Sequence, residues 1–168
     1  MPPDSPAASL TIPAAVFLEH WQGHRRVTRR VIEAFPDEQL FTFAVGGMRP
    51  FSALALELVG MASGMVRGIA TRTWPAVGEL IHHAGGSEPA TKAELLRVWD
   101  ATTDEMNTLW PSITTERFGE TDTAFGQYTG RIYDFLFYCL DNEVHHRGQG
   151  YVYLRALGVG PPAFYDRS

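Results

Sequence analysis

The sequence predicts an all-α fold in which a single domain, residues 1–168, forms a four-helix bundle. Four segments place apolar residues at intervals of about 3.6 positions, which is the period of an amphipathic helix. The stretches between them are rich in glycine, proline and threonine and contain no convincing strand pattern. A chain of 168 residues is also long enough to bury one core without the help of disulfide bonds.

The first helix is expected over about 13–35 and the second over about 52–70. Pro13 suits the first turn of the first helix, and Ser52 suits the capping position of the second. Glu57 falls within the apolar stripe of the second helix, which is unusual for an acid unless its carboxylate is paired or coordinated. The apolar members of that stripe are Leu54, Leu58, Met61, Met65 and Ile69.

A long crossover rich in glycine and proline separates the second helix from the third, and it is expected to hold at most one short helical turn. The third helix is expected over about 91–110, because Thr91 and Glu94 form a capping-box pattern. A loop with short extended pieces follows. The fourth helix is expected over about 131–157, with Gly158 as its C-terminal cap.

The composition limits the cellular compartments and the binding partners that the protein can be expected to have. The net charge of -5 disfavours nonspecific binding to nucleic acid. Cys139 is the only cysteine, so the chain can form neither an internal disulfide nor a thiolate cluster for zinc. The N-terminal stretch lacks the pattern of a signal peptide, and no stretch reaches the ~18 apolar residues that a membrane span requires. We therefore expect a cytoplasmic protein that does not enter a membrane.

One basic run, HRRVTRR at positions 24–30, stands out against this acidic background. Its four arginines form two pairs spaced four residues apart, so that they share one side of a helix. We favour a solvated helix face over a patch for nucleic acid or an acidic partner, so nucleic-acid binding is not the expected function.

The fourth predicted helix carries polar residues in the middle of its inward side. Asn142 and His146 are four residues apart, a spacing that lets two helical side chains hold one metal ion. Glu143 could replace Asn142 after a small rotation of the helix. With Glu57, these residues form a donor set suited to a divalent ion such as Zn, Ni, Fe or Mn. The whole predicted seam is Ile132, Phe135, Cys139, Asn142, His146, Gln149 and Tyr153.

Another interpretation of the same residues is purely structural. Glu57, Asn142, His146 and Gln149 could form a buried hydrogen-bond network that only fixes the register of the helices. His145 points about 100° away from His146, so we expect it to be partly exposed or to support the site from outside.

Three further groups compete for a chemical role. His20 and His24 lie four residues apart on the first helix and are expected to be a core or boundary pair, with metal ligation as the alternative. His82 and His83 lie in the crossover and are expected to be solvated. Cys139 is expected to be a small apolar core residue, because no histidine and acid are spaced around it as a nucleophile requires.

Several motifs of the chain resemble the DinB/YfiT-like superfamily. HHRGQ at 145–149 is followed by YLRALG at 153–158 and by the aromatic exit PPAFYD. MRPF at 48–51 leads into the second helix, and TKAELL at 91–96 opens the third. The resemblance covers nearly the whole chain.

The resemblance implies a bundle with an up-down-down-up course, often a homodimer, and in many members a divalent metal on three histidines. One of those histidines lies in the second helix, where this chain has Glu57. The other two histidines lie four residues apart in the fourth helix, and the second of them stands directly before RGQ. This chain retains the second as His146 and has Asn142 in place of the first. The implied ligands are therefore Glu57, Asn142 and His146, with Glu143, His145, Arg147 and Gln149 as alternative ligands or supporting residues.

Some members are transferases or isomerases that use a low-molecular-weight thiol such as mycothiol or bacillithiol, which the metal would hold as a thiolate. We therefore expect a metal-binding protein, either a thiol-dependent transferase or a hydrolase, that acts on a small molecule. Arg147 would pair with a structural partner or with an anionic substrate. The alternative is a non-catalytic structural or interaction dimer, associated with stress or DNA damage, in which the metal site is degenerate.

Overall fold

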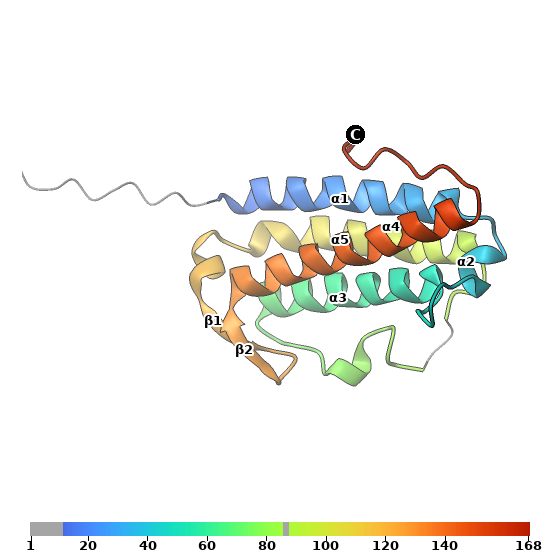
Figure 1. The fold of residues 1–168 in the computed structure, drawn as a ribbon. Coiled ribbons are helices and arrows are strands. Elements are labelled where there is room, and N and C mark those ends of the chain that lie inside the picture. Colours follow the sequence, from blue (N-terminus) through green and yellow to red (C-terminus); the bar gives the residue numbers. More distant parts are fainter. Residues whose placement is uncertain (1–11, 86–87) are drawn as a thin grey trace, which may run out of the picture.

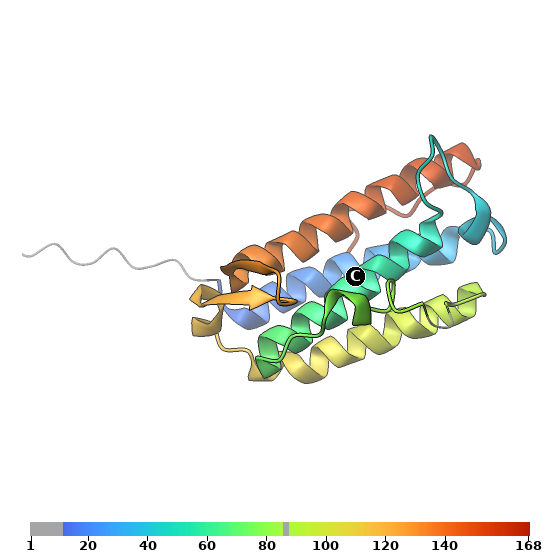
Figure 2. The same ribbon diagram turned by 90° about the horizontal axis from the view of Figure 1, so that it is seen from below.

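The computed structural model describes residues 12–85 and 88–168 of the chain. Most of this part is helical, as the sequence predicts. Four long helices lie side by side, and Figures 1 and 2 show α1 and α5 running in one direction and α3 and α4 in the other. Their bounds are α1 (Ala14–Ala34), α3 (Phe51–Thr71), α4 (Lys92–Leu109) and α5 (Ile132–Ala156).

Short elements complete the described part of the chain. The predicted linker after α1 contains one helical turn, α2 (Gln39–Thr42), and the crossover contains the expected short turn at Val77–Glu79. Two further 3₁₀ turns, Trp110–Ser112 and Glu116–Gly119, follow α4. The strands β1 (Thr121–Ala124) and β2 (Tyr128–Arg131) then form an antiparallel hairpin directly before α5. The expectation of an all-α fold is therefore wrong at this hairpin.

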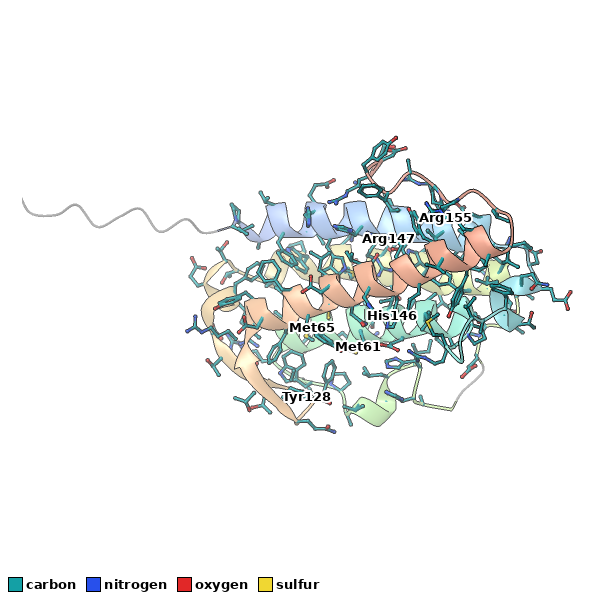
Figure 3. All side chains as sticks on the ribbon, in the orientation of Figure 1. Met61, Met65, Tyr128, His146, Arg147 and Arg155 are labelled. Atoms are coloured by element: carbon teal, nitrogen blue, oxygen red, sulfur yellow. The ribbon has the colours of Figure 1, made fainter. Side chains whose placement is uncertain are left out.

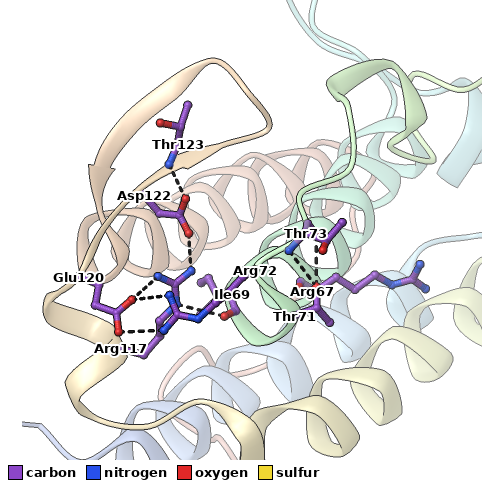
Figure 4. A network of polar contacts seen from close by, with 9 residues as sticks. All are labelled: Arg67, Ile69, Thr71, Arg72, Thr73, Arg117, Glu120, Asp122 and Thr123. Carbon is purple, nitrogen blue, oxygen red and sulfur yellow. Dashed lines mark hydrogen bonds and ion pairs between the residues drawn. The ribbon is translucent and has the colours of Figure 1, made fainter.

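The hairpin is fastened to the end of α3 by a buried arginine (Figure 4). Arg117 is 5% exposed and donates from Nε to the main-chain carbonyl of Ile69 at 3.2 Å. Its other nitrogens bind the carboxylates of Glu120 and Asp122. Arg72 at the end of α3 donates two hydrogen bonds to Glu120. Because the hairpin has only two short strands, such anchoring is needed to fix its position.

The helix ends follow the predicted signals in two of four cases. Pro13 stands directly before α1 and not in its first turn. Thr91 Oγ accepts a hydrogen bond from the Glu94 amide at 3.2 Å, and the Glu94 carboxylate accepts one from the Thr91 amide. Gly158 ends α5 with a φ of 75°, which lets the chain leave the helix in the left-handed region. Ser52 does not cap α3, because the helix already begins at Phe51 after Pro50.

The core helix of the bundle is α3, which contacts both α4 and α5 along its length. It is long and apolar enough to cross a membrane by length and composition, with a mean hydropathy of 1.4. However, 67% of its most apolar window is buried inside the molecule, as in a core helix of a soluble globular protein. The expectation that no stretch reaches the length of a membrane span is thus wrong for α3.

The crossover packs against α3 along a stripe of three glycines, Gly60, Gly64 and Gly68, which are spaced four residues apart. A Cβ atom at these positions would overlap, in turn, with the side chains of His82, Leu80 and Trp74. The crossover therefore runs antiparallel to α3 and lies directly on its backbone. This close approach requires glycine and brings His82 to within one turn of Glu57.

Gly68→Ala is expected to destabilise the protein by about 1–3 kcal/mol, because the new methyl group would displace the Trp74 ring. Urea unfolding followed by tryptophan fluorescence would measure this loss. Gly148→Ala is the matched control, since Gly148 also lies within a helix but has no neighbouring atom within 4 Å of its Cβ position. That variant should instead gain roughly 0.5–1 kcal/mol. Equal effects at both positions would contradict the close packing.

Candidate functional site

The inward side of α5 is rotated relative to the predicted seam. Asn142 and Gln149, which were expected at the centre of the seam, are only partly buried. Glu143, which was expected beside the seam, is 2% exposed and lies in the core. His146 is buried at the boundary between the two sides. The buried residues of α5 are Ile132, Leu136, Cys139, Leu140, Glu143, His146, Arg147, Gly150, Tyr153 and Leu154.

The structure nevertheless brings together Glu57, Asn142 and His146. Glu57 Oε1 lies 3.2 Å from His146 Nε2 and accepts a hydrogen bond from Asn142 Nδ2 at 3.4 Å. The other carboxylate oxygen, Oε2, accepts a hydrogen bond from Arg49 at 2.5 Å. One turn of α3, one turn of α5 and Arg49, which lies two residues before α3, thus meet at one carboxylate.

The hydrogen bonds of this cluster determine the charge of its members. The bonds from His146 and Arg49 hold the pKa of Glu57 far below its usual range, although partial burial opposes them. Burial lowers the pKa of His146, but its bonds to Glu57 and Gln149 outweigh burial and raise the pKa above its ordinary value. Glu57 is therefore a carboxylate at neutral pH, and His146 is biased toward its protonated form.

Gln149 orients the imidazole of His146. Its Oε1 lies 2.7 Å from His146 Nδ1, while its amide Nε2 donates to the sulfur of Met48 at 3.4 Å. This orientation of the amide makes Nδ1 the donor of the His146–Gln149 hydrogen bond. Nε2 therefore faces Glu57, which is the arrangement that commonly prepares a histidine to bind a metal through its second nitrogen.

The donor atoms fit a divalent ion only in part. Two donors bound at 2.0–2.1 Å to one tetrahedral zinc ion lie about 3.3 Å apart, close to the 3.2 Å between Glu57 Oε1 and His146 Nε2. Asn142 would offer its Oδ1 after its amide turns over. Across residues 12–85 and 88–168, however, no three histidine, cysteine or acidic side chains gather as a metal would require. The residues thus fit an ion held by two strong donors and one weak donor.

A cavity of about 660 Å³ opens beside Glu57, which is the one predicted ligand that lines it. The side chains come from α3, α5, the crossover and the hairpin. Figure 3 shows Met61 and Met65 following one another along α3 and Tyr128 below them on the hairpin. The lining consists of Arg49, Glu57, Met61, Met65, Val77, Leu80, His82, His83, Ala124, Phe125, Tyr128, Asp134, Phe135 and Tyr138.

His82 is not the solvated loop residue that the sequence predicts. Its ring lies on Gly60, and its Nδ1 atom is buried without a hydrogen-bond partner among the described residues. Burial lowers the pKa of His82, so the ring is neutral at pH 7. The signal that could have placed this residue is the glycine stripe of α3, because three glycines at helical spacing indicate that another segment approaches closely.

Glu143 and Arg147 are turned away from this cavity and toward α1. Glu143 accepts hydrogen bonds from the Trp21 indole at 3.0 Å and from the Thr28 hydroxyl at 2.7 Å. Arg147 Nη2 lies 2.9 Å from His24 Nδ1, and Figure 3 shows Arg147 on the opposite side of α5 from His146. The structure therefore does not bring Glu143 to Glu57 as a ligand, and it gives Arg147 a structural partner.

The other histidines considered from the sequence and the single cysteine lie outside the Glu57 cluster. His24 is 6% exposed, and burial together with Arg147 lowers its pKa to about 4. His20 is exposed and lies 3.3 Å from Arg167. His145 is exposed, as expected. Cys139 is buried, and burial raises the pKa of its thiol, so it is not a reactive nucleophile.

The four arginines of the HRRVTRR run do not all lie on one solvated face of α1. Arg25 is 1% exposed and lies 4.1 Å above the Trp99 ring, and burial lowers its pKa to about 10. The expectation fails here because the run crosses from the surface of α1 into its buried side. The other three arginines of the run donate hydrogen bonds to neighbouring groups. Their acceptors are the carboxylates of Glu19, Glu33 and Asp100 and the main-chain carbonyls of residues 166–168.

Comparisons with known proteins agree on the fold. A family model described as "DinB family" matches residues 8–168. A crystal structure of a DinB-like protein from Bacillus cereus ATCC 10987 is similar, with a TM-score of 0.72, 19% identity, and coverage of 91% of this chain and 98% of that chain. A DinB-like protein (YjoA) from Bacillus subtilis gives a TM-score of 0.70, 18% identity, and coverage of 90% and 99%. No curated protein matches the chain.

Proposed function

The chain belongs to the DinB family, and from this premise we propose that it binds a divalent metal ion weakly and acts on a small molecule in the adjacent cavity. The observation that carries the proposal is the convergence of Asn142 and His146 on one oxygen of Glu57. Glu57 and His146 would be the strong ligands, and Asn142 would be the weak one. Zn, Ni, Fe and Mn all accept such a set of donors.

A thiol-dependent transferase or a hydrolase is the activity that this arrangement supports best. When bound, the metal would lower the pKa of a thiol or of a water molecule. The chain's own residues would prepare the site. Gln149 fixes the proton of His146 on Nδ1, and Arg49 binds the Glu57 oxygen that does not face His146, so that Oε1 stays directed into the site. A low-molecular-weight thiol would enter through the 660 Å³ cavity.

The proposal includes a cytoplasmic homodimer. A chain with one buried cysteine is suited to a reducing compartment. The outer side of α5 exposes Phe137, Val144 and Val152, which a second copy would cover.

Elemental analysis of untagged protein tests the metal proposal. We expect a substantial fraction of an equivalent of a transition metal after incubation with Zn, Ni or Mn, and we expect a chelator to lower the melting temperature of the wild type. His146→Ala should abolish both effects, whereas His145→Ala, which removes an exposed neighbour, should preserve them. Less than about a tenth of an equivalent of every metal would refute the proposal.

A second candidate function is favoured by the ion pair between Arg49 and Glu57. With this pair in place, both oxygens of Glu57 and both nitrogens of His146 have partners, so the cluster is stable without a metal. The chain would then be a structural or interaction protein. In that case His146→Ala would lower the melting temperature by the same amount with and without chelator.

A further inference from the structure

The cavity beside Glu57 has two chemically different ends. Glu57, Met61 and Met65 line it at intervals of four residues, so this wall spans about 12 Å along α3. His82 packs on Gly60, one turn from Glu57, whereas Phe125 packs on Gly64. Arg49 and His82 therefore lie at the Glu57 end, and Phe125 lies toward the hairpin end.

The polar end favours an anion. Arg49 uses one terminal nitrogen for Glu57, and its side chain is 53% exposed, so the rest of its guanidinium fork can donate to a second acceptor. Arg49, Asn142 and His146 already donate to both oxygens of Glu57, so its negative charge is largely balanced within the protein. His82 also lines this end, with its buried Nδ1 atom turned toward Gly60.

The other end favours an apolar group and disfavours a second charge. Met61 and Met65 form an adaptable wall, because methionine side chains are flexible and polarizable. Phe125 and Phe135 close this end, and the Trp74 ring centre lies 5.5 Å from Phe125 and 6.3 Å from Phe135. Asp134 also lines the cavity on the α5 side, so a ligand with a second carboxylate would be repelled there.

We propose that this cavity binds a monocarboxylate of about eight carbons in all, whose extended apolar tail fits along the α3 wall. The carboxylate binds Arg49, and the tail lies along Met61 and Met65 toward the aromatic end. This inference rests on the proposed function in one respect, that the head group lies next to the Glu57–His146 pair.

Isothermal titration of the wild type with octanoate, in buffer that contains EDTA, tests the inference. Octanoate should bind with one site per chain. Butyrate should bind roughly 100-fold more weakly, because it lacks four methylene groups. Octylamine, which carries the same tail and the opposite charge, should not bind. If octanoate fails to bind, or octylamine binds as tightly, the inference is wrong.

Two variants locate the ligand. Arg49→Gln should weaken octanoate binding by ~10-fold or more, because a charged hydrogen bond is lost. The matched control is Arg67→Gln on α3, which removes an arginine paired with Glu105 outside this cavity and should bind as the wild type does. Met61→Trp should block the tail.

The presence of EDTA separates ligand binding from metal binding. Because EDTA is present, octanoate binding does not depend on the metal. Octanoate binding, together with less than about a tenth of an equivalent of metal in the elemental analysis, would refute the proposed function and leave the inferred ligand class unaffected. Unchanged octanoate affinity in Arg49→Gln would refute the ligand's placement, whatever the metal content.

Discussion

Asn142→His is expected to raise the affinity of the protein for Zn²⁺ by ~100-fold or more, because it replaces an amide, a poor ligand for zinc, by an imidazole. Position 142 lies one turn before His146 on α5, and its side chain already reaches Glu57 Oε1 at 3.4 Å. The variant would supply the third strong donor, so that Glu57 and two histidines leave one coordination position open.

Titration calorimetry with Zn²⁺ on the apo forms of the wild type and the variant would measure the gain. Asp141→His is the matched control, since it adds a histidine at the neighbouring, exposed position of the same helix. The control should leave the affinity unchanged. If both variants gain equally, the added histidine binds zinc at the surface, and the convergence on Glu57 would have no bearing on metal binding.

Glu143→Ala is expected to cost about 3–5 kcal/mol of the free energy of unfolding, the largest loss that we predict for a single substitution. The carboxylate is 2% exposed, and its removal would leave the Trp21 indole and the Thr28 hydroxyl without an acceptor. It would also remove the negative charge that acts on Arg25 and Arg147, both of which are buried.

Urea unfolding monitored by circular dichroism would measure this loss. Glu33→Ala is the control, because Glu33 forms an ion pair with Arg29 at the surface and should contribute no more than about 1 kcal/mol. The double variant Glu143→Leu/Arg147→Leu should recover part of the loss, since it removes both charges together. A loss below 1 kcal/mol in Glu143→Ala would mean that the buried charges are not coupled.

The long helices could be predicted because their apolar period and end signals are local. Thr91 and Gly158 mark helix ends through bonds to residues a few positions away, and both signals were correct. The hairpin at 121–131 could not be predicted in the same way. Its strands have four residues each, and its position depends on Arg117, whose bonds reach the end of α3.

The proximity of Asn142 and His146 to Glu57 could be predicted from the sequence, but the residues that surround them could not. The spacing of Asn142 and His146 correctly placed them opposite Glu57, because four residues on a helix return to the same side. Glu143 is buried because it accepts hydrogen bonds from Trp21 and Thr28 of α1. The apolar pattern of α5 alone carries no information about these partners, so it did not predict the rotation of the helix. Arg49 was missed because the loop before α3 gives no periodic signal for its direction.

The stripe of Gly60, Gly64 and Gly68 has a consequence for how this sequence can diverge. Each glycine accommodates one side chain of the crossover, so a larger residue on α3 must be matched by a smaller one at position 82, 80 or 74. Among homologues, these three pairs should therefore covary, and His82 should be found only where position 60 is glycine. Substitutions in this stripe and in the crossover are thus one coupled set. Because His82 and Leu80 line the cavity, ligand preference should change with them.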